Sequence, residues 1–281
     1  ESLERLKDVG AIILDFSHPI ILYEQEKLRQ ILEYLHRCVP NIMLIDGLEE
    51  HALIKRMSDI PVDFVVAPYV GAVKQDGPWR FLAGPSYAVL SGAYAGLETR
   101  IIRLQTDRVL ISCGGSDPKK ITLTLLKGIE KITKTLQVRV IIGPLFNENL
   151  KETIKKVVKN SKHFITLVDS PHGLLSHMLW CDLAIAASGL IKYELAATST
   201  PAILVSIDEF HHLMNQPFSK IGSTVDLGAR VKPQMITEHV KNLLDNHTMR
   251  LAMATAGRQA IDGKGAERLI SEITRSCCVA Q

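Results

Sequence analysis

RVLISCGGSDP, residues 108–118, is the stretch of sequence that decides the fold. A short, almost wholly apolar run ends in Gly-Gly-Ser, and an amphipathic segment begins at Ile121. This pattern is typical of a buried parallel strand that is followed by a helix. Gly114 and Gly115 permit positive φ and a close approach of the backbone to a ligand. Because backbone amides and a helix N-terminus attract anions, Gly114, Gly115 and Ser116 are candidate phosphate contacts.

A structural interpretation of the same turn competes with this one. Asp117 is expected to be the N-cap of the following helix, with Pro118 in its first position. We assign Asp117 and Pro118 to the cap and leave the three residues before them for the ligand. The turn matches neither G-x-G-x-x-G nor G-x-x-x-x-G-K-[ST], so neither the dinucleotide fingerprint nor the P-loop applies.

The strand–turn–helix pattern recurs along the chain. Short β-branched runs alternate with amphipathic segments of helical length, which is the signature of right-handed β-α-β units. The expected strands are residues 11–16, 41–45, 63–67, 108–113, 138–143, 163–168, 182–186 and 201–205. Expected helices include residues 121–133, 147–158 and 190–198. The sequence therefore predicts an α/β protein with two Rossmann-like domains.

A break in this rhythm, rich in glycine and proline, lies between residues 70 and 107. It predicts a linker between an N-terminal domain, residues 1–105, and a C-terminal domain, residues 106–281. The first domain shows only three or four strands, so we expect it to be incomplete. In the second, Pro233 suits the first turn of a helix, and residues 263–265 separate the last two helices.

Composition excludes several classes of protein. The 281 residues are 46% hydrophobic and 22% charged, which indicates a globular chain rather than a disordered one. The net charge of +3 is too even for a dedicated nucleic-acid binder. No apolar run approaches the ~20 residues of a membrane-spanning helix. Five cysteines without a C-x-x-C pair favour reduced thiols, and hence a cytoplasmic protein.

A second candidate turn is ASGLIKYE, residues 187–194. Ser188 could donate to a phosphate oxygen, and Gly189 keeps the approach open. Glu194 falls one and a half turns into the expected helix, where a carboxylate can accept both hydroxyl groups of a ribose. Alone, Glu194 would more often be a solvated helix residue. Two such turns in one domain strengthen the ligand interpretation, because open α/β sheets bind ligands at the carboxyl ends of their strands.

Other polar residues also follow expected strands. Asn215 and Gln216 suit sugar hydroxyls or a phosphate, although an exposed helical turn is an equal alternative. The neighbouring pair His211–His212 lacks the i,i+4 spacing of a helical metal site, and no D-x-D occurs, so no metal is expected. In the first domain, His18 is a candidate general base and Tyr69 could face the same cleft. A lone histidine of this kind is more often structural.

The run Val109–Pro118 with ITLTLLKGI, residues 121–129, resembles the UDP-sugar hydrolases of pseudaminic-acid biosynthesis and the related spore-coat polysaccharide glycosyltransferases. Further matching segments follow in the family's order and spacing. They are GPSYAVL (84–90), IGP (142–144), VD (168–169), YELA (193–196) and NQ (215–216).

This resemblance implies a GT-B fold, with UDP held by the C-terminal domain and removed by water attack at the anomeric carbon without a metal or other cofactor. The implied UDP-binding residues are Gly114, Gly115, Ser116, Val168, Ser188, Gly189, Leu190 and Glu194. The implied sugar- or phosphate-facing residues are Asn215, Gln216 and Tyr69.

Two departures from the family's sequence pattern weaken the transfer of its activity to this chain. The family's catalytic histidine lies in a Gly-x-Gly-His loop that this sequence lacks, so we expect it upstream of Glu1, with His18 as a substitute within the chain. Family hydrolases also tend to carry tyrosine where this chain has Ser17. The 281 residues are expected to bind UDP and to hydrolyse UDP-sugars very slowly. A glycosyltransferase and a non-catalytic nucleotide-sugar binder stay open as alternatives, and the sequence leaves the oligomeric state open.

Overall fold

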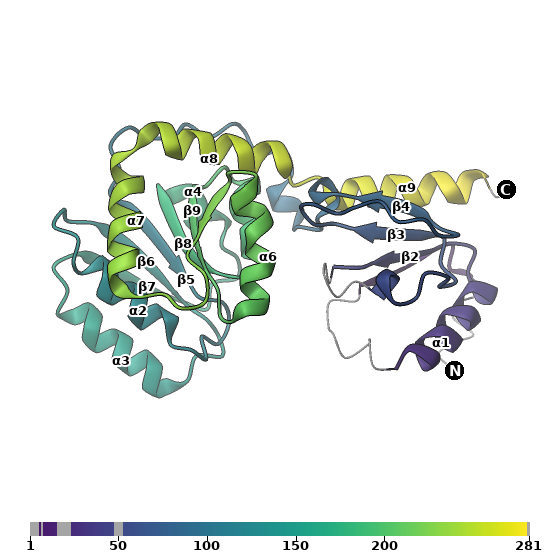
Figure 1. Ribbon diagram of the computed structural model, residues 1–281, viewed down its shortest axis with the longest axis horizontal. Coiled ribbons are helices and arrows are strands. Elements are labelled where there is room, and N and C mark those ends of the chain that lie inside the picture. Colours follow the sequence, from purple (N-terminus) through teal and green to yellow (C-terminus); the bar gives the residue numbers. More distant parts are fainter. Residues whose placement is uncertain (1–5, 7, 16–23, 48–52, 280–281) are drawn as a thin grey trace. The chain divides into compact units, whose positions relative to one another are not determined.

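The computed structural model describes residues 6, 8–15, 24–47 and 53–279 of the chain. The chain divides into two compact units (Figure 1). The first unit contains residues 1–92 together with residues 263–281, and the second contains residues 93–262. Each unit is described by itself below.

Within its described residues, the first unit has a four-stranded parallel sheet in the order β1-β2-β3-β4. The strands are β1 (Ile12–Asp15), β2 (Ile42–Ile45), β3 (Phe64–Ala67) and β4 (Arg80–Ala83). Strands β2 and β3 are buried at every position, as their continuous apolar sequences predict for strands covered on both faces. Helix α1 (Gln25–Cys38) covers one face through Leu28 and Leu32. Short 3-10 turns η4 (Leu53–Lys55) and η5 (Pro85–Tyr87) lie in the connections.

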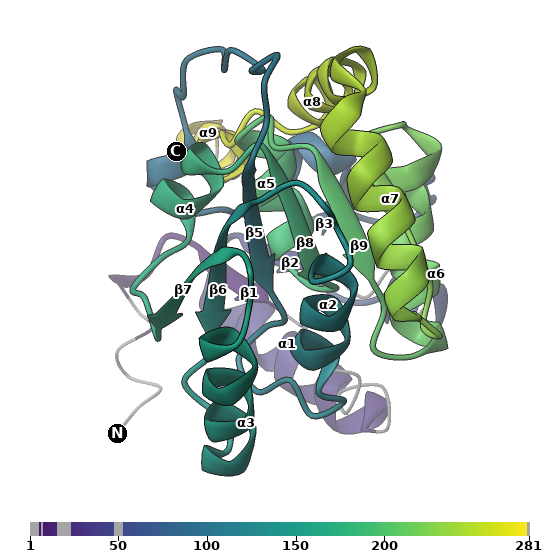
Figure 2. The ribbon, with the colours of Figure 1, turned by 90° about the vertical axis from the view of Figure 1, so that its left-hand side faces the viewer.

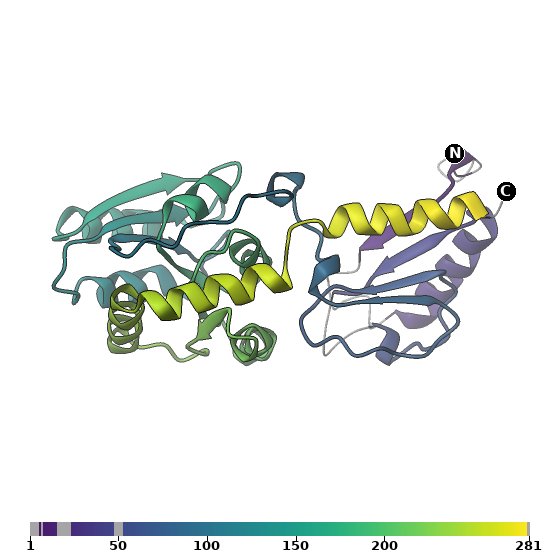
Figure 3. The ribbon, with the colours of Figure 1, turned by 90° about the horizontal axis from the view of Figure 1, so that it is seen from above.

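The last helix, α9 (Gly265–Val279), covers the other face of this first sheet (Figures 1 and 3). Leu269 and Ile273 are buried in one cluster with side chains of β2 and β3. The helix begins so close to the chain after η5 that a Cβ on Gly265 would lie 2.0 Å from the carbonyl oxygen of Ala88. Residues 263–281 therefore pack with the first unit, whereas the sequence prediction assigned them to the second domain.

The second unit has a six-stranded parallel sheet in the order β10-β9-β8-β5-β6-β7, counted over the residues that the structure describes. Its strands are β5 (Arg108–Ser112), β6 (Gln137–Ile142), β7 (Phe164–Asp169), β8 (Leu183–Ala187), β9 (Ala202–Val205) and β10 (Thr224–Asp226). Its helices are α2 (Ile121–Ile129), α3 (Glu148–Lys159), α4 (Leu175–Trp180), α5 (Ile191–Ala197), α6 (Glu209–Lys220), α7 (Pro233–Asp245) and α8 (His247–Ala260). A 3-10 turn, η6 (Gly92–Tyr94), spans the division between the units.

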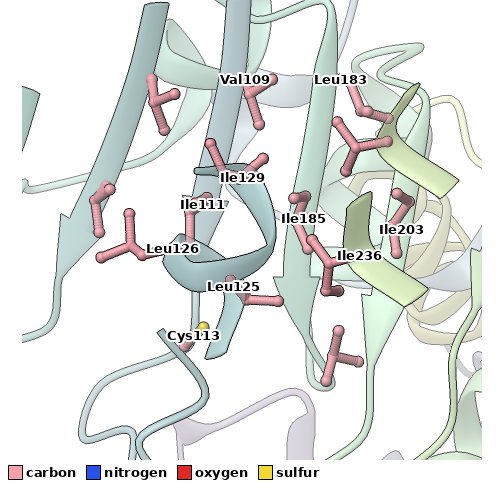
Figure 4. Packing of buried hydrophobic residues seen from close by; sticks show 14 of the residues in the cluster. Val109, Ile111, Cys113, Leu125, Leu126, Ile129, Leu183, Ile185, Ile203 and Ile236 are labelled. Atoms are coloured by element: carbon pink, nitrogen blue, oxygen red, sulfur yellow. The ribbon is translucent and has the colours of Figure 1, made fainter. Parts of the chain in front are cut away.

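Alternate residues of each strand build the core of the second unit. Figure 2 shows α2, α3 and α7 in front of the strands, and α2 lies closest to β5 in Figure 4. Val109, Ile111 and Cys113 point from β5 and its end toward Leu125 and Ile129 of α2, and all five are at most 3% exposed. Each large aliphatic side chain buried in this way stabilises the fold by about 1.5–3 kcal/mol. Helices α4 and α5 contact β5, β8 and β9, and α8 packs on α5.

The segment that the sequence analysis treated as a linker belongs in part to the second unit, which begins at residue 93 rather than 106. Basic side chains of α8 donate hydrogen bonds to its carbonyl groups. Arg258 donates to Leu97, and Arg250 donates to Arg103 and Leu104. An extended segment has few backbone donors of its own for its carbonyl groups. The bonds from α8 therefore hold this segment to the second unit.

All eight predicted strands are confirmed, and so is the α/β fold with two Rossmann-like units. Pro233 opens α7 as expected. Strands β4 and β10 were not predicted, because β4 lies within the glycine- and proline-rich segment and β10 has only three residues. Helix α2 ends at Ile129 rather than at residue 133. Among the described residues, no helix is both long enough and apolar enough to cross a membrane.

Candidate functional site

The sheet of the second unit has a topological switch point between β5 and β8. From β5 the chain continues outward through β6 to β7, and it then returns to β8 on the opposite side. Ligands of open α/β sheets bind outside the carboxyl ends of the two strands that flank such a point. Both glycine-containing turns of the sequence analysis follow these two strands, so the fold brings them to one edge of the sheet.

The first turn, residues 114–116, is exposed, and Gly114 has a φ of 78°. Within the described part of the chain, the amides of these three residues donate to no backbone carbonyl. The carbonyl oxygen of Gly115 instead accepts a bond of 2.8 Å from the amide of Leu145. A Cβ on Gly143 would lie 2.3 Å from that oxygen, so the turn packs directly against the end of β6.

Asp117 caps α2, but from a different position than predicted. Its buried carboxylate accepts the amides of Ile121 at 2.7 Å and Thr122 at 2.9 Å. The helix begins at Ile121 with Lys120 as the preceding residue, so the prediction that Pro118 occupies the first helical position is wrong. Positive φ values at Asp117 and Lys120, 43° and 54°, turn the chain sharply on both sides of Pro118. Because Asp117 takes the helix amides, the amides of residues 114–116 are the ones available to an anion.

The second turn contains Ser188 and Gly189 and leads into α5. Gly189 has a φ of 126°, and Leu190 is 56% exposed. The hydroxyl of Ser188 accepts a bond of 2.8 Å from Nδ2 of Asn215, which also donates to the hydroxyl of Ser206 at 3.0 Å. Asn215 is fully buried, and its Oδ1 has no partner within the described residues. The structure thus places Asn215 beside Ser188 and holds this serine in position.

Glu194 lies half-buried in α5. Burial raises the pKa of its carboxyl group above the ordinary value, and a hydrogen bond from the hydroxyl of Tyr94 acts in the opposite direction. Tyr94 is itself only 4% exposed. A carboxylate with one donor among the described residues and partial access to solvent can accept further hydrogen bonds, as a ribose would offer.

The structure adds residues that sequence reasoning missed. His212 on α6 lies with Nδ1 2.5 Å from Oδ2 of Asp226, the last residue of β10. Lys192 is 3% exposed and donates from Nζ to the carbonyl of Met214 at 2.7 Å, which ties α5 to α6. Nothing in the local sequence signals either contact, because a helical lysine is usually solvated and Asp226 reaches His212 only through the pairing of β10 with β9.

The remaining candidates occupy separate places. Val168 is half-buried in β7, two strands away from β5. Gln216 follows Asn215 on α6, and its Nε2 lies 3.3 Å from Nε2 of His212. Tyr69 belongs to the first unit, where it follows β3 and is 9% exposed. His18, with Ser17, lies outside the described residues. Over the same described residues, no group of three or more His, Cys, Asp or Glu side chains is arranged to hold a metal ion.

Comparison with solved structures identifies the fold. Acinetobacter baumannii MurG superposes with a TM-score of 0.66 over 98% of this chain and 75% of MurG, at 13% sequence identity. The fold is of the GT-B type. The UDP-GlcNAc 2-epimerase from Neisseria meningitidis, solved with UDP-GlcNAc bound, gives a TM-score of 0.63 over 98% of this chain and 79% of the epimerase, at 12% identity.

Sequence comparison points to proteins of sugar metabolism. The pattern of the lipid-A-disaccharide synthetase family, LpxB, matches residues 103–209, less than half of the chain. The Bacillus subtilis spore coat polysaccharide biosynthesis protein SpsG is 23% identical over 75% of this chain and 63% of SpsG. The Helicobacter pylori pseudaminic acid cytidylyltransferase and UDP-2,4-diacetamido-2,4,6-trideoxy-beta-L-altropyranose hydrolase is 32% identical over 44% of this chain and 21% of that protein. Each match spans less than two thirds of the curated relative.

Proposed function

We propose that the second unit binds the UDP part of a nucleotide sugar at the carboxyl ends of β5 and β8. One observation carries this proposal: two exposed glycine turns flank the topological switch point, and Glu194 follows one of them. The amides of residues 114–116 and the hydroxyl of Ser188 are suited to the diphosphate. The carboxylate of Glu194 is suited to the hydroxyl groups of the ribose. Val168 and Leu190 complete the proposed UDP contacts, and Asn215, Gln216 and Tyr69 are proposed to face the sugar or its phosphate.

We further propose that the chain processes a UDP-sugar in nonulosonic-acid or surface-polysaccharide biosynthesis, and that it does so by hydrolysis. In this reaction a water oxygen forms a bond to the anomeric carbon while the bond from that carbon to the phosphate oxygen breaks. UDP leaves with the electron pair of the broken bond, and a general base takes the proton of the water. The named hydrolase activity of the Helicobacter pylori relative supports this choice. His18 is the candidate base within the chain.

Transfer of the sugar to an acceptor hydroxyl is the second candidate. The match of residues 103–209 to lipid-A-disaccharide synthetases favours it, because such a synthetase joins two sugars. Product analysis separates the possibilities. The protein is incubated with UDP-GlcNAc and other UDP-sugars, with and without sugar acceptors. Free sugar with UDP supports hydrolysis, sugar–acceptor conjugates support transfer, and binding without any product supports a nucleotide-sugar binder.

Glu194→Gln is expected to weaken UDP binding without destabilising the protein. The substitution removes the charge that accepts the ribose hydroxyls, and losing hydrogen bonds to a charged group costs about 1–3 kcal/mol, roughly 5- to 150-fold in the dissociation constant. Isothermal titration of UDP into the full chain measures this change. The proposal for the ribose fails if the variant binds UDP with unchanged affinity.

Stability against pH supplies the control for this variant. Burial raises the pKa of Glu194, so the folded state disfavours its ionised form. The stability contribution of the wild-type residue is therefore greatest below the ordinary carboxyl pKa and declines as the pH rises through the raised one. Glu194→Gln should match or exceed the wild type in melting temperature at pH 8 and lose that advantage near pH 4. A variant that melts lower at pH 8 and binds UDP normally would make Glu194 a structural residue.

A further inference from the structure

A continuous network of hydrogen-bonded side chains, called the side-chain network below, runs across the carboxyl ends of β8, β9 and β10. It starts at Ser188, passes through Asn215 to Ser206, and continues from the hydroxyl of Ser206 to Oδ1 of Asp226 at 3.5 Å. From Asp226 it reaches His212 at 2.5 Å. The side-chain network thus connects the second glycine turn with an aspartate–histidine pair that the proposed UDP contacts do not include.

Asp226 is held so that it can orient the imidazole. Its side chain is 4% exposed, and its Oδ1 accepts the amide of Gly228 at 3.0 Å. The other oxygen faces Nδ1 of His212, which therefore carries a hydrogen and donates it. With Nδ1 committed in this way, Nε2 is the ring nitrogen that faces other partners.

Nε2 of His212 is placed to exchange partners. The side chain of His212 is 26% exposed, and Nε2 lies 3.3 Å from Nε2 of Gln216. A neutral ring accepts a hydrogen bond from the amide nitrogen of Gln216 there, whereas a protonated ring must donate instead. Protonation of His212 therefore breaks the contact with this amide nitrogen, and Nε2 then needs an oxygen acceptor.

The same face of α6 leads from His212 to Ser188 in the second glycine turn. Asn215 lies three residues after His212, so the two side chains share a face of the helix, and Asn215 contacts Ser188. The buried Oδ1 of Asn215 is without a partner among the described residues. Ser206, the other partner of Asn215, lines a hollow of about 200 Å³ together with residues that include Lys119.

We propose that His212 takes up a proton when a nucleoside diphosphate binds at Ser188, and that Nε2 then donates to the diphosphate. This inference rests on the proposed function. An imidazolium between the carboxylate of Asp226 and an anionic diphosphate is favoured on both sides, because charged hydrogen bonds are the stronger ones. Asp226 is a positioning residue that fixes the ring and its tautomer.

Other charged groups surround α6. On the helix itself, Asp208 pairs with His211 at 2.6 Å, and Glu209 lies in the first turn. Lys192 of α5 donates to the backbone of α6, and Lys119 acts electrostatically on Asp208 from the turn before α2. His211 provides a matched control, since it is also an aspartate-bound histidine but its partner, Asp208, is 53% exposed and lies outside the side-chain network.

The test is the number of protons taken up with UDP. Calorimetric titration of UDP into the full chain is performed at pH 7.5 in HEPES and in Tris, whose ionisation enthalpies differ. We expect His212→Gln to lower the uptake by up to about one proton per UDP relative to the wild type. Asp226→Asn is expected to lower it partially, and His211→Gln is expected to leave it unchanged. Melting temperatures confirm that each variant is folded, and His212→Asn replaces His212→Gln if the latter does not fold.

Each outcome decides the inference. Loss of uptake in the His212 and Asp226 variants alone supports it. Equal uptake in the wild type and His212→Gln, with UDP bound by both, overturns it and leaves the proposed UDP site intact. Equal losses in the His211 and His212 variants also overturn it. A wild-type protein that does not bind UDP overturns the proposed function, and this inference falls with it.

Discussion

Arg250→Ala is expected to lower the free energy of unfolding of the second unit by about 3–5 kcal/mol. Arg250 is completely buried, and burial lowers its pKa. Its guanidinium donates to Leu243 at 2.6 Å and Leu244 at 2.8 Å in the last turn of α7. It also donates to Arg103 at 2.7 Å and Leu104 at 3.3 Å. Hydrogen bonds from a charged donor contribute about 1.5–3 kcal/mol each, and alanine leaves the carbonyl groups of Leu243 and Leu244, whose contacts with Arg250 are buried, without this donor.

The measurement must report on the second unit alone, because the two units can unfold separately. The chain has two tryptophans, Trp79 in the first unit and Trp180 in the second. Urea unfolding followed by fluorescence in a Trp79→Phe background therefore follows the second unit. Arg230→Ala, which removes an exposed arginine of the same unit, should change its stability by less than about 0.5 kcal/mol. Equal effects of the two substitutions would show that the hydrogen bonds of Arg250 add nothing to the fold.

Arg250 also illustrates why the domain boundary was predicted incorrectly. Local sequence pattern identified strands well, because a run such as Val109–Ile111 is apolar throughout and is soon followed by Gly114. The same pattern contains no information on which distant carbonyl groups a basic side chain will reach. Arg250 contacts Arg103 across 147 residues, and this bond assigns the supposed linker to the second unit. Similarly, the amphipathic pattern of α9 predicts a helix but not the sheet on which Leu269 and Ile273 pack.

The candidate site, too, could be predicted from the sequence only in part. Glycine turns at strand ends were visible in the sequence because Gly114 and Gly189 adopt positive φ, which other residues rarely do. The sheet order then brought both turns to the switch point. The contacts of Asn215 and His212 with residues at the carboxyl ends of β8, β9 and β10 depend on strand register, which no single segment encodes. Asp117 was correctly predicted to cap α2, but the positive φ of Lys120 displaced the helix start.

Gly143→Ala is expected to weaken UDP binding by about 10- to 100-fold. A Cβ at this position would lie 2.3 Å from the carbonyl oxygen of Gly115 and 2.5 Å from that of Gly114. Carbon–oxygen contacts in proteins are about 3.3 Å or longer, so the turn must move by about 1 Å or the end of β6 must shift. Either movement displaces the amides of residues 114–116 from the proposed diphosphate. Overpacking of this kind typically costs 1–3 kcal/mol.

A glycine with free space around it provides the control for this change. Gly173 follows β7, and a Cβ there would meet no atom within 4 Å. Gly173→Ala should bind UDP like the wild type in the same calorimetric titration, which separates the clash from the general effect of a glycine-to-alanine change. Melting curves of both variants distinguish a displaced turn from a unit that no longer folds. If Gly143→Ala remains folded and binds UDP with wild-type affinity, the amides of residues 114–116 do not hold the diphosphate, and the anion must be bound elsewhere on the second unit.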